Sequence, residues 1–138
     1  MDIRDVIDVT YNTLVGNSVT FSKFETIEES AEKFIENYGE KNIDYRDDYG
    51  NTFLHYAIFY RNFDVCKFLL KKGASPNIKN MEGYTAMMYS ILYGDCSYVH
   101  LLLEYGGDPR IKDNFGVDSF DLSNNKEVSE LLFAFYST

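Results

Sequence analysis

The chain has 138 residues, of which 22 are acidic and 13 are basic, so its formal net charge is −9 at pH 7. With 45% hydrophobic and 17% aromatic residues, the composition is that of one folded domain and excludes intrinsic disorder for most of the chain. A surface this acidic repels phosphate groups, so we expect no binding to nucleic acid or to anionic membranes.

Residues 1–41 are predicted to form helices that cap one end of the fold. The acidic charge is concentrated in this part, because residues 1–50 hold 12 acids and 5 bases. Thr26 and Glu29 have the spacing of a capping box. Phe34 and Ile35 give the following helix an apolar side, and Gly39 is suited to end it. We expect a helical cap or a degenerate repeat here; an acidic docking face is the functional alternative.

A period of 33 residues organises the rest of the chain. Both turn residues and core residues recur at this spacing, which is the sequence signature of a repeat architecture. The recurring positions are Asp47, Asn80 and Asp113; Gly50, Gly83 and Gly116; Leu54, Met87 and Phe120; and the pairs Thr52 with Thr85, Leu69 with Leu102, Leu70 with Leu103, Gly73 with Gly106 and Pro76 with Pro109. Because each unit has one apolar face that only a neighbouring unit can cover, the units are expected to stack.

Within each period the residues predict a turn followed by two helices. An Asp or Asn three residues before Gly50 or its equivalents suits a tight turn that closes on a glycine at positive φ. Thr52 and Thr85 are suited to cap the first helix. The second helix has apolar residues at helical spacing and is expected to end at Gly73 or Gly106.

These residues resemble the ankyrin repeat. The family's Asp-x-x-Gly-x-Thr-Pro-Leu-His signature appears at residues 47–55, and its closing Leu-Leu-x-x-Gly-Ala-Asp-Pro-Asn signature appears at residues 69–77 and 102–110. The resemblance implies an all-α solenoid of stacked helix-turn-helix units with short hairpin-like connecting turns. Its repeats would be 42–74, 75–107 and a shortened C-terminal repeat at 108–138, which lacks three residues between its helices. Phe53 and Ala86 replace the proline, and Met88 replaces the histidine.

Enzymatic and metal-binding motifs do not emerge from the sequence. His55 lies at the family's structural position, and His100 is expected on the outer face of a second helix. A calcium loop that begins at Asp44 would need Gly at its sixth position and Glu at its twelfth, where this chain has Tyr49 and His55. No phosphate-binding glycine motif is present. We therefore expect no catalysis, no cofactor and no metal.

The two cysteines favour a reducing compartment. Cys66 and Cys96 have no Cys-x-x-Cys spacing, and the sequence contains no glycosylation acceptor. We interpret Cys66 as a small buried hydrophobe and Cys96 as a surface thiol. A cytoplasmic location is predicted, with the nucleus as the alternative.

The resemblance also implies where a partner protein binds. In ankyrin proteins the turn tips and the exposed side of each first helix line a concave groove. Carried over to this chain, these positions are Asp48, Tyr49, Asn51, Phe59, Tyr60, Met81, Glu82, Tyr84, Leu92, Tyr93, Asn114, Phe115 and Val117. Six of these thirteen residues are aromatic, as is typical of protein interfaces. The alternative for any one of them is packing under a neighbouring helix.

The sequence therefore predicts an intracellular protein-binding module. Its Asn, Ile, Lys and Tyr usage favours an AT-rich genome, which suggests a host-interaction factor. Two other roles stay open. Asn77 resembles the target of asparaginyl hydroxylation in ankyrin repeats, although its amide could simply cap a turn. Residues 128–136 are apolar on more than one face, which would allow a homodimer.

Overall fold

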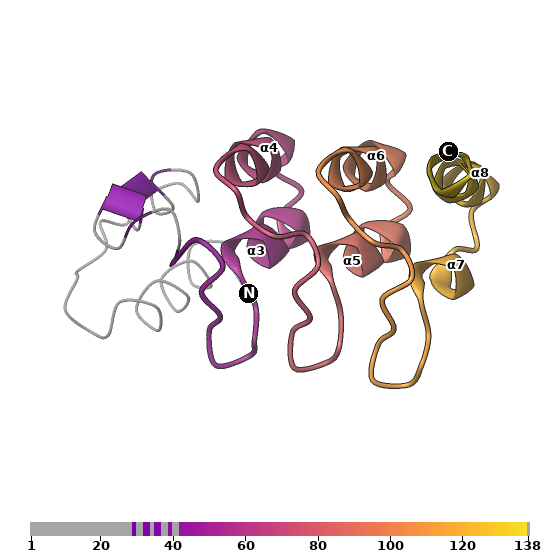
Figure 1. Ribbon diagram of the computed structural model, residues 1–138, viewed down its shortest axis with the longest axis horizontal. Coiled ribbons are helices and arrows are strands. Elements are labelled where there is room, and N and C mark those ends of the chain that lie inside the picture. Colours follow the sequence, from indigo (N-terminus) through magenta and orange to yellow (C-terminus); the bar gives the residue numbers. More distant parts are fainter. Residues whose placement is uncertain (1–28, 30–31, 34, 37–38, 40–41, 138) are drawn as a thin grey trace. The chain divides into compact units, whose positions relative to one another are not determined.

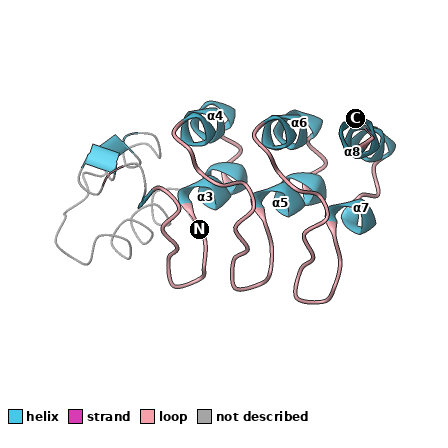
Figure 2. Ribbon diagram, in the orientation of Figure 1, coloured by secondary structure: helices cyan, strands magenta, loops and turns pink. Residues whose placement is uncertain are grey.

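The structure, a computed structural model, describes residues 29, 32–33, 35–36, 39 and 42–137. These residues belong to two compact units, Met1–Ala74 and Ser75–Thr138. The first unit contains α3 (Phe53–Phe59) and α4 (Phe63–Lys71). The second contains α5 (Ala86–Leu92), α6 (Cys96–Glu104), α7 (Ser119–Leu122) and α8 (Lys126–Tyr136). No strand occurs in the part of the chain that the structure describes, so the predicted all-α class is confirmed (Figure 2).

The predicted N-terminal cap falls mostly outside the described residues. Thr26, the first residue of the predicted capping box, lies outside the described residues, whereas Glu29 is helical. Glu32, Lys33, Ile35 and Glu36 are helical, and Ile35 is half-buried. Gly39 has a φ of 84°, and its N–H donates to the Ile35 carbonyl at 2.7 Å, so this helix ends where the sequence predicted.

A hairpin turn closed by one buried Asp or Asn precedes each first helix. Oδ1 of Asp47 accepts hydrogen bonds from the backbone N–H groups of Tyr49 and Asn51, both at 2.9 Å. Asn80 and Asp113 accept from the same relative positions, at distances of 2.8 to 3.0 Å. The glycine three residues later has a φ of 75 to 85° in all three turns. The predicted turn geometry is therefore confirmed. The turn requires Asp or Asn to accept the two backbone N–H groups and glycine to adopt the positive φ.

The first helices begin at caps that the sequence also predicted. The Thr52 hydroxyl accepts from the His55 N–H at 3.4 Å, and Nδ1 of His55 accepts from the Thr52 N–H at 3.1 Å. In the next repeat the Thr85 hydroxyl accepts from the Met88 N–H at 3.3 Å, and the methionine side chain returns no bond. His55 is 1% exposed, so this histidine is structural.

The second unit is built from two layers of helices (Figure 1). α5 packs against α6 and α7, and α6 packs against α8. The buried residues of this unit include Met87, Met88, Ile91, Val99, Leu102, Val128 and Leu132. In the first unit α3 packs against α4, and the core includes Leu54, Ala57, Ile58, Val65, Cys66 and Leu69. Each core is therefore a row of small helix contacts, as expected for stacked repeats.

The last repeat has a short first helix and a long second one. α7 has 4 residues, whereas α3 and α5 have 7 each. Asp118 and Asp121 cap it reciprocally, with bonds of 3.0 and 3.4 Å. α8 has 11 residues, two more than α6, and it continues through Tyr136, which stands at the repeat position of Gly106. The three residues that this repeat lacks are thus one turn of its first helix.

The environments of the cysteines differ from each other. Both are free thiols. Cys66 is completely buried, as predicted, and burial raises the pKa of its thiol to about 12. Cys96 was expected at the surface but is half-buried, because it is the first residue of α6 and lies beside Glu127. Burial, followed by the charge of Glu127, raises the pKa of the Cys96 thiol.

Candidate protein-binding surface

The turn tips carry large apolar side chains in open solvent. In the first unit Tyr49 is 64% exposed and the neighbouring Asp48 is also exposed. In the second unit Met81 is 68% exposed and Phe115 is 88% exposed. Glu82 and Asn114, which complete the set, are exposed as well. We call these six residues the tip surface, which has one part in each unit: Asp48 and Tyr49 in the first unit, and Met81, Glu82, Asn114 and Phe115 in the second.

Hydrogen bonds hold the two tips of the second unit together. Nδ2 of Asn114 donates to the Met81 carbonyl at 3.0 Å, and the Lys79 ammonium donates to the Lys112 carbonyl at 3.0 Å. Both bonds join residues one repeat apart. A Cβ at Gly83 would lie 2.5 Å from Oδ1 of Asn114, so the glycine permits the close approach of the two turns. Met81 and Phe115 are therefore presented from one ordered surface.

The ends of the first helices provide a second set of aromatic residues. Leu92 and Tyr93 are exposed at the end of α5. Phe59 and Tyr60 are half-buried at the end of α3, where both rings contact Tyr56. The Phe59 ring meets that of Tyr56 edge-on at 5.6 Å, and the Tyr60 ring stacks on it at 6.5 Å. These two residues therefore contribute to the local packing as well as to the surface.

Three residues predicted to face a partner are engaged within the turns. Asn51 is buried, and its Nδ2 donates to the Tyr56 hydroxyl oxygen at 3.5 Å, so the prediction for Asn51 is corrected: its side chain bonds to α3. Tyr84 is half-buried, with its ring edge-on to Tyr89 at 5.2 Å. Val117 is half-buried, and its N–H is bound by the turn. These three residues share one position in the repeat, directly after the turn glycine, and this position distinguishes them from the exposed residues before the glycine.

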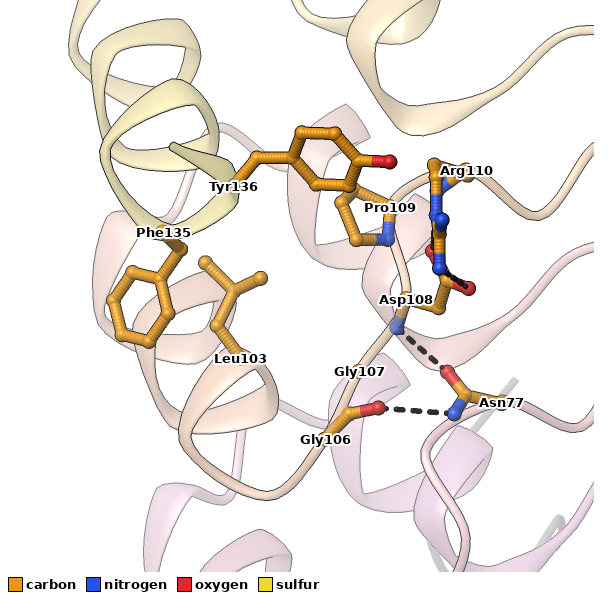
Figure 3. Close-up of a pocket in the computed structure, with 9 residues that line it drawn as sticks. All are labelled: Asn77, Leu103, Gly106, Gly107, Asp108, Pro109, Arg110, Phe135 and Tyr136. Atoms are coloured by element: carbon orange, nitrogen blue, oxygen red, sulfur yellow. Dashed lines mark hydrogen bonds and ion pairs between the residues drawn. The ribbon is translucent and has the colours of Figure 1, made fainter. Parts of the chain in front are cut away.

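Asn77 ties its own loop to the next one. Its Nδ2 donates to the Gly106 carbonyl at 3.0 Å, and its Oδ1 accepts from the Asp108 N–H at 2.8 Å (Figure 3). The side chain thus bridges two successive repeats, in addition to the bond from its own N–H to the Ser75 hydroxyl at 3.2 Å. Hydroxylation at Asn77 stays a prediction. An enzyme that binds this segment in an extended form would have to break both hydrogen bonds of the Asn77 side-chain amide.

A pocket of about 360 Å³ lies beside this bridge, between the loop after α6 and the end of α8 (Figure 3). Arg110 donates from Nε to Oδ1 of Asp108 at 2.9 Å, and its guanidinium carbon lies 5.2 Å from the centre of the Tyr136 ring. The hydrogen bond from Arg110 lowers the pKa of Asp108. The ionisable groups of the pocket are thus paired with one another. The sequence pattern did not predict this pocket, although Arg110 stands where the closing signature of the family has Asn.

The second histidine lies on the surface of α6. His100 is exposed, with Nδ1 3.4 Å from a carboxylate oxygen of Glu104 and its ring edge-on to Phe135 at 5.4 Å. Among the described residues, no three His, Cys, Asp or Glu side chains come close enough to hold a metal ion. Within the same residues, no helix combines the length and apolar character needed to cross a membrane.

The repeated hairpin, capped helix pair and closing glycine define this chain as a repeat module of the ankyrin type. A family model described as ankyrin repeats in 3 copies matches residues 23–113. The chain belongs to the ankyrin-repeat family, as the sequence signature predicted. Members of this fold bind other proteins through their surfaces.

Known relatives cover parts of the chain. An ankyrin repeat protein of Acanthamoeba polyphaga mimivirus is 35% identical over 78 residues, which is 55% of this chain and 18% of that protein. An ankyrin repeat protein of fowlpox virus is 50% identical over 40 residues, which is 28% of this chain and 8% of that protein. The human transient receptor potential cation channel subfamily A member 1 is 53% identical over 34 residues, 25% of this chain and 3% of the channel. The chain thus spans less than a fifth of each relative.

A solved structure shows the same fold. The ankyrin repeat domain of Bcl-3, a member of the IkappaB protein family, aligns with a TM-score of 0.70 and 21% sequence identity. The alignment covers 77% of this chain and 46% of that one. The solenoid architecture predicted from the sequence is thereby confirmed.

Proposed function

We propose that this chain binds a partner protein through the tip surface, extended by Leu92 and Tyr93 at the end of α5. The observation that carries the proposal is the exposure of Tyr49, Met81 and Phe115, which range from 64% to 88% exposed. Large apolar side chains held in water on a rigid turn are unfavourable for the isolated chain and favourable in an interface.

The requirements of folding do not account for these side chains. The turn is fixed by its buried Asp or Asn and by its glycine, and it uses only the backbone of the two positions between them. At these positions Asn114 bonds the Met81 carbonyl and Glu82 accepts from the Tyr89 hydroxyl, whereas the apolar side chains stand in solvent. The three tips fill these positions with Asp48 and Tyr49, with Met81 and Glu82, and with Asn114 and Phe115. Each tip therefore combines an apolar anchor with a polar neighbour, the composition of an interface core with its rim.

The proposal is tested with a triple variant that carries Tyr49→Ser, Met81→Ser and Phe115→Ser. We expect its free energy of unfolding to lie within about 0.5 kcal/mol of that of the parent chain, because exposed positions contribute little to stability. We expect the same variant to lose the proteins that the parent captures from cell extract. The matched control is Phe63→Ser, an exposed aromatic residue of α4 outside the tip surface. Equal losses in the control, or full capture by the triple variant, would refute the proposal.

We also propose that the chain acts by binding rather than by catalysis. The ionisable groups of the Figure 3 pocket are paired with one another, which supports this assignment. The two free thiols support a reducing intracellular compartment, cytoplasmic or nuclear. The mimivirus and fowlpox virus relatives support a host protein as the partner, since that is the class of protein a viral binding module would meet.

A further inference from the structure

The exposed side of α4 carries basic residues in an acidic chain. Residues 61–72 hold four bases and one acid, whereas the whole chain has a net charge of −9. All four basic side chains are exposed. We call them the basic surface of α4: Arg61, which precedes the N-cap, Lys67, Lys71 and the C-cap Lys72. The acid of this segment is Asp64, which lies in the first turn of the helix.

The repeat itself does not require a basic residue at any of these four positions. In the other two repeats the equivalent positions hold no Lys or Arg: they are Gly94, His100, Glu104 and Tyr105, and Asn124, Glu130, Ala134 and Phe135. Cations near the end of a helix complement its macrodipole, which would account for Lys71 and Lys72. However, α6 and α8 end without a basic residue in the last turn. Folding therefore does not explain the basic charge of α4.

Arg61 has a backbone conformation that suits glycine better. Its φ is 53°, and Gly94 at the equivalent position of the next repeat has a φ of 70°. A residue with a Cβ is unfavourable in this left-handed region, so arginine weakens the fold at this point. Backbone outliers of this kind cluster where a side chain serves a function. The strain at Arg61 therefore also points to a function of the basic surface.

Lys67 and Lys71 lie one helical turn apart on the same side of α4. Within the described part of the chain neither ammonium group forms an ion pair, and Asp64 does not pair with Lys67 although it precedes it by three residues. The equivalent residues of α6, His100 and Glu104, approach each other to 3.4 Å. Two like charges one turn apart destabilise a helix, and an anionic partner relieves their repulsion.

We propose that the basic surface of α4 binds a short acidic segment of a partner protein, whose Asp and Glu carboxylates contact the basic groups. α4 has 9 residues and is about 14 Å long, a distance that about four residues of extended chain span. Nucleic acid or an anionic membrane would also meet the acidic remainder of the chain, which repels it. In Figure 1, α4 and the hairpin turn of the same unit lie on opposite sides of α3, so this contact leaves the Tyr49 tip free.

NMR titration of the isotope-labelled chain with the peptide acetyl-Glu-Asp-Glu-Asp-Glu-Asp-amide tests this proposal, at about 0.1 M ionic strength to screen distant charges. We expect saturable shifts of the α4 amide signals and a dissociation constant on the order of 1 mM, because exposed ion pairs are individually weak.

Charge reversal locates the contact. The double variant Lys67→Glu with Lys71→Glu should raise the dissociation constant at least about tenfold; Lys72 is kept, because its ammonium lies 5.9 Å from the centre of the Phe68 ring. The matched control, Lys112→Glu with Lys126→Glu, changes the net charge equally at two exposed positions of the second unit and should stay within about twofold of the parent. If the double variant fails to fold by circular dichroism, Lys67→Glu replaces it.

Arg61→Gly provides a readout that unfolding cannot imitate. We expect this variant to bind the peptide about threefold more weakly while its thermal midpoint rises, because it loses a charge and relieves the backbone. The proposal is overturned if the α4 signals of the parent chain do not shift, if a Gln-Asn peptide of the same length shifts them equally, or if the control loses as much affinity as the double variant. Tighter binding of phosphatidylserine vesicles or single-stranded RNA to the same residues would overturn the assignment to an acidic protein segment.

Discussion

Replacing Gly107 by alanine makes the chain more like its family at this position, and we expect it to lose stability. Ala74 is the repeat equivalent of Gly107, and both donate from N–H to the carbonyl five residues earlier, at 3.0 and 2.8 Å. At Gly107, however, a Cβ would lie 2.6 Å from the methyl carbon of Met87 and 2.8 Å from the Leu102 carbonyl oxygen. The methionine can move aside, but the carbonyl belongs to the backbone of α6.

The expected magnitude follows from two opposing effects. Gly→Ala substitution restricts the unfolded chain and raises the free energy of unfolding by about 0.4–1 kcal/mol where the conformation permits it. Forcing a methyl group into a filled site costs about 1–3 kcal/mol. We therefore expect Gly107→Ala to lower the free energy of unfolding by about 1–2 kcal/mol, because the carbonyl contact cannot be relieved by a side-chain rotation alone.

Urea unfolding followed by far-ultraviolet circular dichroism measures this difference. The matched control is Ala74→Gly at the equivalent position, where alanine is buried and fits. We expect it to lower the free energy of unfolding by about 1 kcal/mol, through lost methyl burial and a freer unfolded chain. Alanine would then be favourable in one repeat and unfavourable in the next. A higher urea midpoint for Gly107→Ala than for the parent chain would refute the reasoning.

Three further predictions concern single side chains. The Ser119 hydroxyl is buried without a hydrogen-bond partner among the described residues, so Ser119→Ala should raise the free energy of unfolding by about 1 kcal/mol in urea titration; a decrease would show that the hydroxyl is satisfied. Arg61 has a φ of 53° where the next repeat has Gly94, so Arg61→Gly should raise the thermal midpoint by a few degrees, equivalent to about 1 kcal/mol; an unchanged midpoint would contradict this. Alkylation of the folded chain should modify Cys96 at least about 100-fold faster than Cys66, whose thiol is buried with a raised pKa; equal rates by mass spectrometry would contradict the burial.

The turns and caps were predictable because single residue types dictate them. A buried Asp47 or Asn80 that binds two backbone N–H groups, followed by a glycine at positive φ, can be found at a fixed spacing without knowledge of the fold. The same applies to the cap at Thr52. These local rules, repeated every 33 residues, also give the family and the solenoid architecture.

The exposure of individual surface residues was less predictable. Repeat position alone grouped Asn51 with Tyr49, although the Asn51 amide turns inward to the Tyr56 hydroxyl and the Tyr49 ring stays in water. The difference depends on contacts between side chains that the period does not encode. Phe120 shows the same limit, because it is half-buried although its repeat equivalents Leu54 and Met87 are fully buried.

The tip surface is tested most directly by site-specific photo-crosslinking. A p-benzoylphenylalanine side chain replaces Tyr49, Met81 or Phe115 in turn, and the fourth variant carries it at Lys126, an exposed residue of α8 outside the tip surface. Because all four positions are open to solvent, the probe itself should not disturb the fold. We expect the three tip positions to form a covalent adduct with the same protein, and position 126 to form none with it. Adducts that arise equally from all four positions, or from position 126 alone, would contradict binding through the tips.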